Sequence, residues 1–97
     1  MLYLYYLRMC ELPTISTFYG IFIRMYFNDH SPPHFHVQYA EFKATVDIQG
    51  LNITSGALPK RAQELVMEWA TLHQQELLVD WKLCMDKLQP NQISPLR

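Results

Sequence analysis

The sequence predicts an α+β domain in which an antiparallel meander of three or four strands is followed by a long or kinked C-terminal helix packed on one sheet face. Between residues 19 and 49, apolar and polar residues alternate in three stretches, which is the period of strands with one buried face. Residues 59–88 are rich in helix-forming residues, with apolar side chains at helical spacing. A chain of 97 residues has the length of one domain, which we place at residues 12–90, with residues 91–97 as a C-terminal tail.

The first predicted strand runs from Tyr19 to Phe27 and is rich in β-branched and aromatic residues. Asparagine, aspartate, serine and two prolines then cluster in residues 28–33, a composition typical of a turn. The chain is therefore expected to reverse there and return as a second strand. Alternation along the first strand defines an apolar face of Ile21, Ile23, Met25 and Phe27 and an opposite face of Phe22, Arg24 and Tyr26.

The second and third strands are predicted at residues 34–40 and 43–49, with Glu41 and Phe42 at the turn between them. Each strand again alternates, so that one sheet face is apolar and the other is polar. The polar face is predicted to carry Arg24, Tyr26, His34, His36, Gln38, Thr45 and Asp47.

The register of the strands follows from matching their apolar faces, because a slip of one residue turns a strand inside out. Pairing Val37 with Val46 meets this condition, and it places His36 opposite Asp47. The same rule applied to the first two strands gives two further neighbours across the polar face, Tyr26 with His36 and Arg24 with Gln38.

The helical part is expected to begin near Pro59, since proline suits the first turn of a helix, and to cover the apolar face of the sheet. Residues 51–54 before it are a candidate fourth strand at the sheet edge. Two apolar stripes in the helical part are out of phase around residues 73–75, which predicts a kink or two consecutive helices. The stripes are Ala62, Leu65, Val66, Trp69 and Leu72, and then Leu77, Leu78, Trp81, Cys84 and Leu88.

Composition argues against several classes of protein. The net charge is −1 and no basic stripe is present, which disfavours direct binding of DNA or RNA. No window approaches the roughly 18 apolar residues that a membrane helix needs. The two cysteines, Cys10 and Cys84, form neither a disulfide framework nor a zinc motif, so we expect a reduced, cytoplasmic protein.

The run from Asp29 to His36 is the candidate functional site. His34 and His36 are two residues apart on a strand, so both rings leave the same face, and His30 lies in the preceding turn. Three imidazoles are a ligand set for a divalent transition metal such as zinc, with Asp29 or Asp47 as a source of a carboxylate. A metal site at His30, His34 and His36 is therefore one interpretation.

Metal-free acid–base catalysis is a second interpretation, because histidine titrates near neutral pH. His34 and His36 would act as acid and base, and Asp47 would orient His36. Arg24 would hold an anion such as phosphate, and Tyr26 would position it. This is the outline of a small phosphodiesterase or ribonuclease. A third interpretation has no chemistry: the histidines lie on the solvent face, and His36 pairs with Asp47 as cross-strand neighbours do. The residues alone leave all three open.

Two large aromatic residues, Phe22 and Tyr26, are predicted on the polar face of the sheet. Aromatic side chains in such a position favour a face that is partly covered, either by a partner protein or by a second copy of the chain. An open sheet edge would also offer a partner strand a place to pair.

The chain resembles the bacterial domain-of-unknown-function family 4160 from about Leu12 to Arg97. The specific part of the resemblance is the DHxPPHFH run; the remaining matched segments are Pro13–Ser16, Phe18–Ile21, Met25–Tyr26, Gly56 with Leu58–Pro59, and Glu68–Ala70 with His73, Glu76–Leu77 and Trp81. The resemblance implies a small prokaryotic protein, often encoded beside a protein of the domain-of-unknown-function family 2442 in a toxin–antitoxin-like pair. The functional expectation is a protein-interaction component of such a two-gene module, with a small protein partner or self-association as a dimer. The alternative is a histidine-based hydrolase or nuclease acting through His30, His34 and His36.

Members of that family commonly begin Met-Pro-Thr-Ile, whereas this chain has Leu12 before Pro13. A UUG or CUG start codon is translated as methionine when it initiates and as leucine when it is read through. Residues 1–11 are therefore expected to be an N-terminal extension. Mass spectrometry of the native N-terminus tests this, since a peptide covering Tyr3 to Glu11 would refute it.

Overall fold

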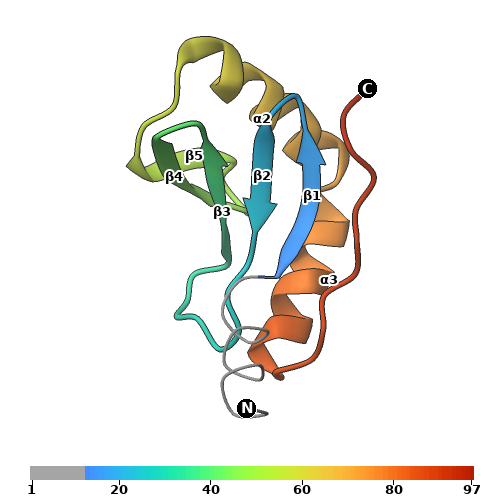
Figure 1. Ribbon diagram of the computed structural model, residues 1–97. Helices are drawn as coiled ribbons and strands as arrows, with labels where there is room; N and C mark the ends of the chain where they lie inside the picture. Colours follow the sequence, from blue (N-terminus) through green and yellow to red (C-terminus); the bar gives the residue numbers. More distant parts are fainter. Residues whose placement is uncertain (1–12) are drawn as a thin grey trace, which may run out of the picture.

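The computed structural model describes residues 13–97, so the predicted extension at residues 1–11 lies outside the described part (Figure 1). An antiparallel sheet with strand order β1-β2-β3-β4-β5 is followed by two helices, which confirms the predicted α+β class. Neither helix within residues 13–97 has the length and hydrophobicity that crossing a bilayer requires. The elements are β1 Thr14–Phe18, β2 Ile21–Arg24, β3 His34–Tyr39, β4 Phe42–Asp47, β5 Asn52–Gly56, α2 Lys60–Leu72 and α3 Gln74–Met85.

The sheet contains one strand more than predicted, because β1 precedes the first predicted strand. Tyr19 and Gly20 both have positive φ angles, of 51° and 78°, as the two central residues of a tight type I′ hairpin turn do. The strand predicted to start at Tyr19 therefore starts at Ile21 and pairs back on β1. The candidate edge strand near residues 51–54 is confirmed as β5.

The predicted faces of the sheet are confirmed, but the predicted register is wrong by two residues. Val37 pairs with Ala44 rather than Val46, so His36 lies opposite Thr45, and Asp47 lies opposite His34. The cause is the hairpin turn, which occupies residues 40–41 rather than 41–42, with Ala40 at a positive φ of 52°. A slip of two residues preserves the buried face, which is why the alternation pattern did not detect it.

The helices cover the apolar face of the sheet, behind the strands in the view of Figure 1. The break predicted around residues 73–75 is confirmed, since α2 and α3 are separated at His73. Trp69 of α2 is the largest fully buried side chain, and its ring packs 5.3 Å from Phe18 and 5.9 Å from Phe35, measured between centroids. Two residues assigned to the apolar stripes, Leu72 and Leu88, are exposed instead.

The two edges of the sheet differ. Residues 90–97 run along β1 (Figure 1), where the backbone N–H of Ile93 donates to the carbonyl of Ile15 over 2.9 Å. The indole N–H of Trp69 donates to the carbonyl of Ser94, and Ile93 is only 3% exposed. The residues predicted as a tail therefore shield the β1 edge, whereas β5 at the opposite edge is largely exposed.

Candidate functional site

The connection between β2 and β3 brings Asp29 back to the start of β3. The backbone N–H of Asn28 donates to the carbonyl of Cys84 over 3.0 Å, which ties the connection to α3. Asn28 has a φ of 55°, a left-handed conformation that asparagine tolerates better than most residues. The chain turns there, and the carboxylate of Asp29 is directed at the first strand positions of β3.

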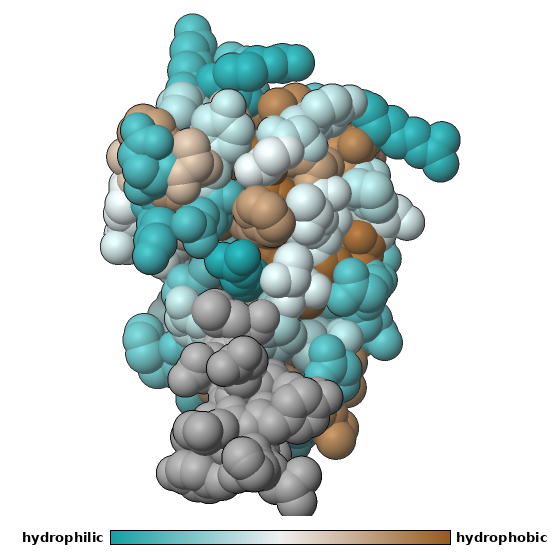
Figure 2. Space-filling view, viewed as in Figure 1, coloured by the Kyte–Doolittle hydropathy of each residue, from teal (hydrophilic) through white to brown (hydrophobic). Residues whose placement is uncertain are grey.

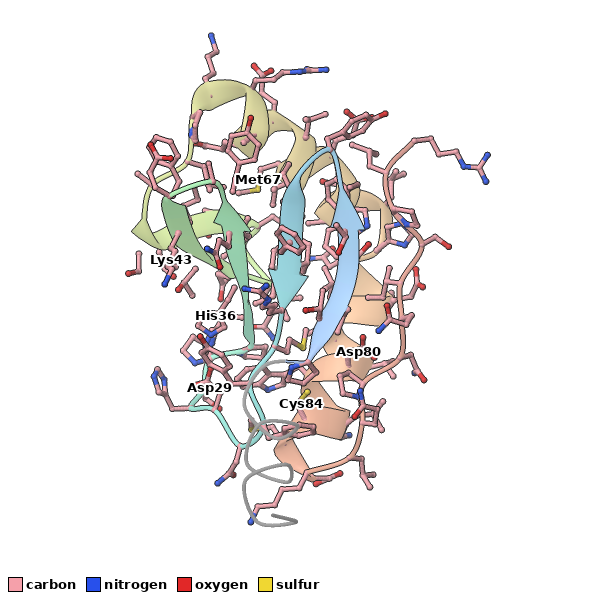
Figure 3. All side chains as sticks on the ribbon, in the orientation of Figure 1. Asp29, His36, Lys43, Met67, Asp80 and Cys84 are labelled. Carbon is pink, nitrogen blue, oxygen red and sulfur yellow. The ribbon has the colours of Figure 1, made fainter. Side chains whose placement is uncertain are left out.

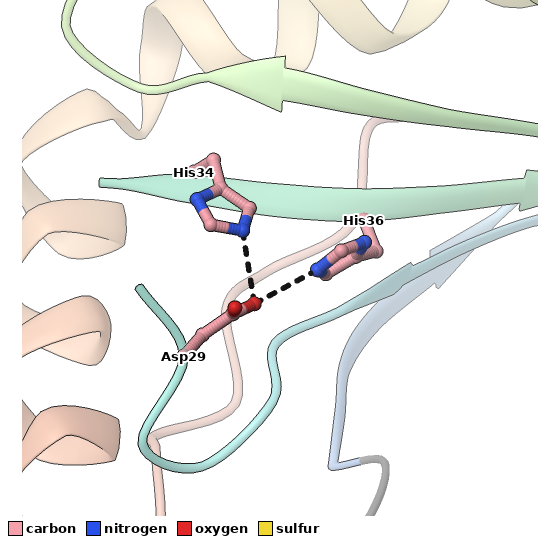
Figure 4. Close-up of side chains that lie close together, drawn as sticks. All are labelled: Asp29, His34 and His36. Carbon is pink, nitrogen blue, oxygen red and sulfur yellow. Dashed lines mark hydrogen bonds and ion pairs between the residues drawn. The ribbon is translucent and has the colours of Figure 1, made fainter. Parts of the chain in front are cut away.

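Asp29, His34 and His36 converge, as Figure 4 shows, and we call them the Asp29–His34–His36 cluster. The Oδ2 atom of Asp29 lies 2.9 Å from Nε2 of His34 and 3.1 Å from Nε2 of His36. All three candidate ligand atoms lie within 4.8 Å of one another. The side chains are 13%, 8% and 25% exposed, respectively, so the cluster is partly withdrawn from water.

His34 is the most constrained member of the cluster. Its Nδ1 atom lies 2.7 Å from the carbonyl oxygen of Pro32, and its ring packs 5.0 Å from the Trp81 ring. Because a carbonyl oxygen only accepts hydrogen bonds, Nδ1 must carry the proton and donate it. In a neutral ring, Nε2 then presents its lone pair to the centre of the cluster.

Within the cluster, the pKa of the Asp29 carboxyl and the pKa of the His36 imidazole are both lowered. Burial alone raises the pKa of Asp29, but hydrogen bonds from the His36 ring and the His30 backbone N–H outweigh it, and the pKa lies below 3.8. Burial is the main cause that lowers the pKa of His36 below 6.5, against the opposing hydrogen bond with Asp29. An ionised carboxylate and a neutral imidazole are the protonation states that bind metal ions.

Two other predicted site residues lie beside the cluster. Arg24 is the cross-strand partner of His36, and the Tyr26 ring stacks on the His36 ring with centroids 4.2 Å apart. The predicted contact between Arg24 and Gln38 is present, since Nη1 of Arg24 donates to Oε1 of Gln38 over 2.8 Å. The contact is diagonal, because the true partner of Gln38 in the sheet is Phe22.

The remaining predicted site residues have different positions. Asp47 does not contact His36, and its carboxylate instead accepts a hydrogen bond from the backbone N–H of Gly50 in the turn before β5. Asp29, rather than Asp47, is the carboxylate beside the His36 ring. His30 lies at the exposed rim of the cluster: its side chain is 87% exposed, Nε2 is 3.7 Å from Oδ1 of Asp29, and its ring centroid is 5.5 Å from that of His34. It is not among the three residues whose candidate ligand atoms converge.

Two shallow hollows adjoin the cluster on the polar face of the sheet. Figure 2 shows the molecule from this side, with mostly hydrophilic residues on the surface and a few hydrophobic ones between them. The first, of about 310 Å³, is lined by Arg24 and Lys43, and we call it the cationic hollow. The second, of about 610 Å³, is lined by Asp29, His30 and Asp47. The hollows share four lining residues, Tyr26, His36, Thr45 and Ser55. Figure 3 shows Asp29, His36 and Lys43 along this side of the sheet, away from Asp80 and Cys84 of α3.

Comparison with known proteins assigns a family without a function. The sequence model of a domain of unknown function, DUF4160, matches residues 20–82, which include β2 to β5, the cluster and most of the helical part. Neither the curated proteins nor the solved structures contain a match. The matched segment is well over half of the chain, and this protein therefore belongs to the DUF4160 family.

Proposed function

We propose that the domain binds one divalent transition-metal ion through the Asp29–His34–His36 cluster and uses it in a small histidine-based hydrolase site. The observation that carries this proposal is the convergence of two imidazole nitrogens and one carboxylate oxygen within 4.8 Å. Two histidines and one carboxylate are a frequent ligand set for catalytic zinc and for non-haem iron. The ligand set proposed from sequence, His30 with His34 and His36, changes by one member: Asp29 replaces His30.

The hydrogen bonds of His34 favour a metal ion over a simple ion pair. Its Nδ1 proton is committed to the carbonyl of Pro32, so the 2.9 Å contact with the Asp29 carboxylate requires a second proton on Nε2. That second proton makes the ring a cation at a residue only 7% exposed, where an ion pair must offset a large desolvation cost. A metal ion takes the place of the proton. Histidine ligands also commonly donate their other N–H to a backbone carbonyl, as His34 does.

Three protein ligands leave coordination positions for water, which is the arrangement of catalytic rather than structural metal sites. A metal ion lowers the pKa of bound water to about 7 in such sites and so generates a nucleophile at neutral pH. The cluster opens onto the two hollows, which give a substrate access to it. Hydrolysis of an ester is the reaction that this arrangement supports best.

Metal analysis with matched histidine variants tests the proposal. We expect the purified chain to retain about one equivalent of metal and to hydrolyse a chromogenic phosphate ester. His34→Ala and His36→Ala should lose both properties, whereas the exposed neighbour His30→Ala should keep them. Equal metal content in His30→Ala and His36→Ala would contradict the proposed ligand set.

A second candidate function is a protein-interaction component of a two-gene, toxin–antitoxin-like module in the cytoplasm. The feature that favours it is β5, which is largely exposed and is the last strand of the sheet formed by residues 13–97. The outer edge of such a strand offers backbone groups with which a partner strand can pair. Phe22 and Tyr26 add exposed aromatic surface on the polar face. Co-purification with the product of the neighbouring gene tests for a heteromeric partner, and light scattering of the chain alone tests for a dimer. A monomer that does not bind the product of the neighbouring gene would contradict this function.

A further inference from the structure

Arg24 is a positioned cation on the open face of the sheet. Its guanidinium donates to Oε1 of Gln38 over 2.8 Å and to Oγ1 of Thr14 over 3.3 Å, and it lies 5.1 Å above the Phe22 ring. The side chain is half-buried, and no carboxylate among residues 13–97 forms an ion pair with it. A half-buried arginine that is held by neutral groups retains N–H donors and a full charge for an external anion.

The surroundings of Arg24 are also positively charged. The cationic hollow of about 310 Å³ contains Lys43 as a second cation, and no carboxylate from residues 13–97 lines it. His36 belongs both to this hollow and to the Asp29–His34–His36 cluster. Arg24 and His36 are direct cross-strand partners, which places their Cβ atoms roughly 4.5–5.5 Å apart. An anion that the guanidinium binds in this hollow therefore lies beside His36, which is also a member of the cluster.

We propose that the cationic hollow is the binding site for a small phosphate ester, whose phosphoryl group lies between Arg24 and the Asp29–His34–His36 cluster. The assignment rests on the proposed function, since the metal ion supplies part of the positive charge. Arginine binds phosphate oxygens in bidentate geometry, and a phosphate monoester carries the charge to match a metal ion with two cations. The volume suits a small molecule. The net charge of −1 opposes a polymeric nucleic acid.

Calorimetric titration of the zinc-loaded full chain with phenyl phosphate tests the assignment, with benzoate as the carboxylate comparison. We expect phenyl phosphate to bind more tightly than benzoate. Arg24→Gln should weaken phenyl phosphate binding by about tenfold or more, because it removes a charge-assisted hydrogen-bonding group. Arg61→Gln is the matched control, since Arg61 is exposed on α2 and paired with Glu64, and it should stay within about twofold of the wild type.

Zinc stoichiometry measured on the same samples separates the two proposals. Arg24→Gln should keep its zinc while losing phenyl phosphate, and Arg24→Lys, which keeps the charge, should bind at an intermediate level. Zinc binding by the wild type without any phenyl phosphate binding would overturn the ester site and leave the metal site standing. If the wild type binds no zinc, the metal-free chain is titrated with phenyl phosphate. The ester site is then supported only if Arg24→Gln weakens the binding of phenyl phosphate, and it is overturned otherwise. Tighter binding of an oligonucleotide than of phenyl phosphate would overturn the small-ester assignment.

Discussion

The Nε2 atom of His34 lies 2.9 Å from the Oδ2 atom of Asp29, although two prolines separate the residues in the sequence. The connection that carries Asp29 is tied to α3 through Asn28, and His34 packs on Trp81 of the same helix. The contact therefore joins a turn, a strand and a helix. It explains how Asp29 comes to lie beside His34 and His36.

The stability of the fold is expected to depend on pH through Asp80. This residue is 1% exposed, and its pKa is raised from 3.8 to about 6. Burial is the main cause of the increase. The hydrogen bond from the Asn91 N–H lowers the pKa, and the negative charge of Glu76 raises it further. Because the folded state binds the proton more tightly than the unfolded chain, this contribution is complete below about pH 4 and is lost as the pH rises through about 6. We expect a loss of up to about 3 kcal/mol in the free energy of unfolding.

Asp80→Asn isolates this contribution, since it keeps the Oδ1 acceptor for the Asn91 N–H and removes the titration. Urea unfolding of both proteins between pH 4 and pH 7 gives the difference in stability at each pH. The wild type should lose stability relative to Asp80→Asn across this range. Parallel pH profiles of the two proteins would show that Asp80 titrates as an ordinary aspartate.

Two glycines with similar backbone angles should respond differently to alanine. Gly20 and Gly56 have φ angles of 78° and 76°, so both substitutions carry the cost of the left-handed region, about 1–2 kcal/mol. A Cβ at Gly20 would meet only the Tyr39 ring at 3.6 Å, whereas one at Gly56 would overlap the Lys43 carbonyl and lie 2.9 Å from Cα of Ala44. Thermal unfolding should therefore show a larger loss for Gly56→Ala than for Gly20→Ala, and equal losses would count against the described β4–β5 pairing.

The C-terminal segment is expected to contribute to stability as part of the core. Ile93 is 3% exposed and its N–H bonds to β1, so Ile93→Ala should lower the free energy of unfolding by about 2–5 kcal/mol. Leu88→Ala is the control, because Leu88 is 53% exposed and its loss should change stability by about 0.5 kcal/mol or less. Chemical denaturation measures both. Similar small effects would mean that residues 90–97 are only loosely attached.

Alternation in the sequence predicted the sheet faces and the helix break, because burial imposes periods of 2 and 3.6 on the side chains. It did not predict the register of β3 and β4, since the turn that sets it places Ala40 in a left-handed conformation without the usual glycine or asparagine. Alternation also did not predict β1. The turn between β1 and β2, at Tyr19 and Gly20, was assigned to the start of the first predicted strand. Local turn geometry, rather than hydrophobic pattern, decided both features.

The sequence predicted two histidines of the candidate site and left its carboxylate open between Asp29 and Asp47. His34 and His36 share a face by strand parity alone, which the structure bears out. Asp47 was expected to orient His36 only because of the register that proved wrong. The position of Asp29 depends on the path of the β2–β3 connection, which periodicity does not describe. The available signal was the position of Asp29 in the turn, five residues before His34.

Titration of the metal-free chain with Zn²⁺, followed by calorimetry, tests the central claim most directly when two aspartate variants are compared. The wild type should bind one equivalent. Asp29→Ala should weaken binding by at least about 100-fold, more than the loss of a residue that only supports a ligand. Asp47→Asn should bind zinc as tightly as the wild type does, because the Asp47 carboxylate accepts a hydrogen bond from the Gly50 N–H in the turn and is not a ligand. A wild type without stoichiometric binding, or an Asp29→Ala variant that binds zinc as tightly as the wild type, would contradict the account.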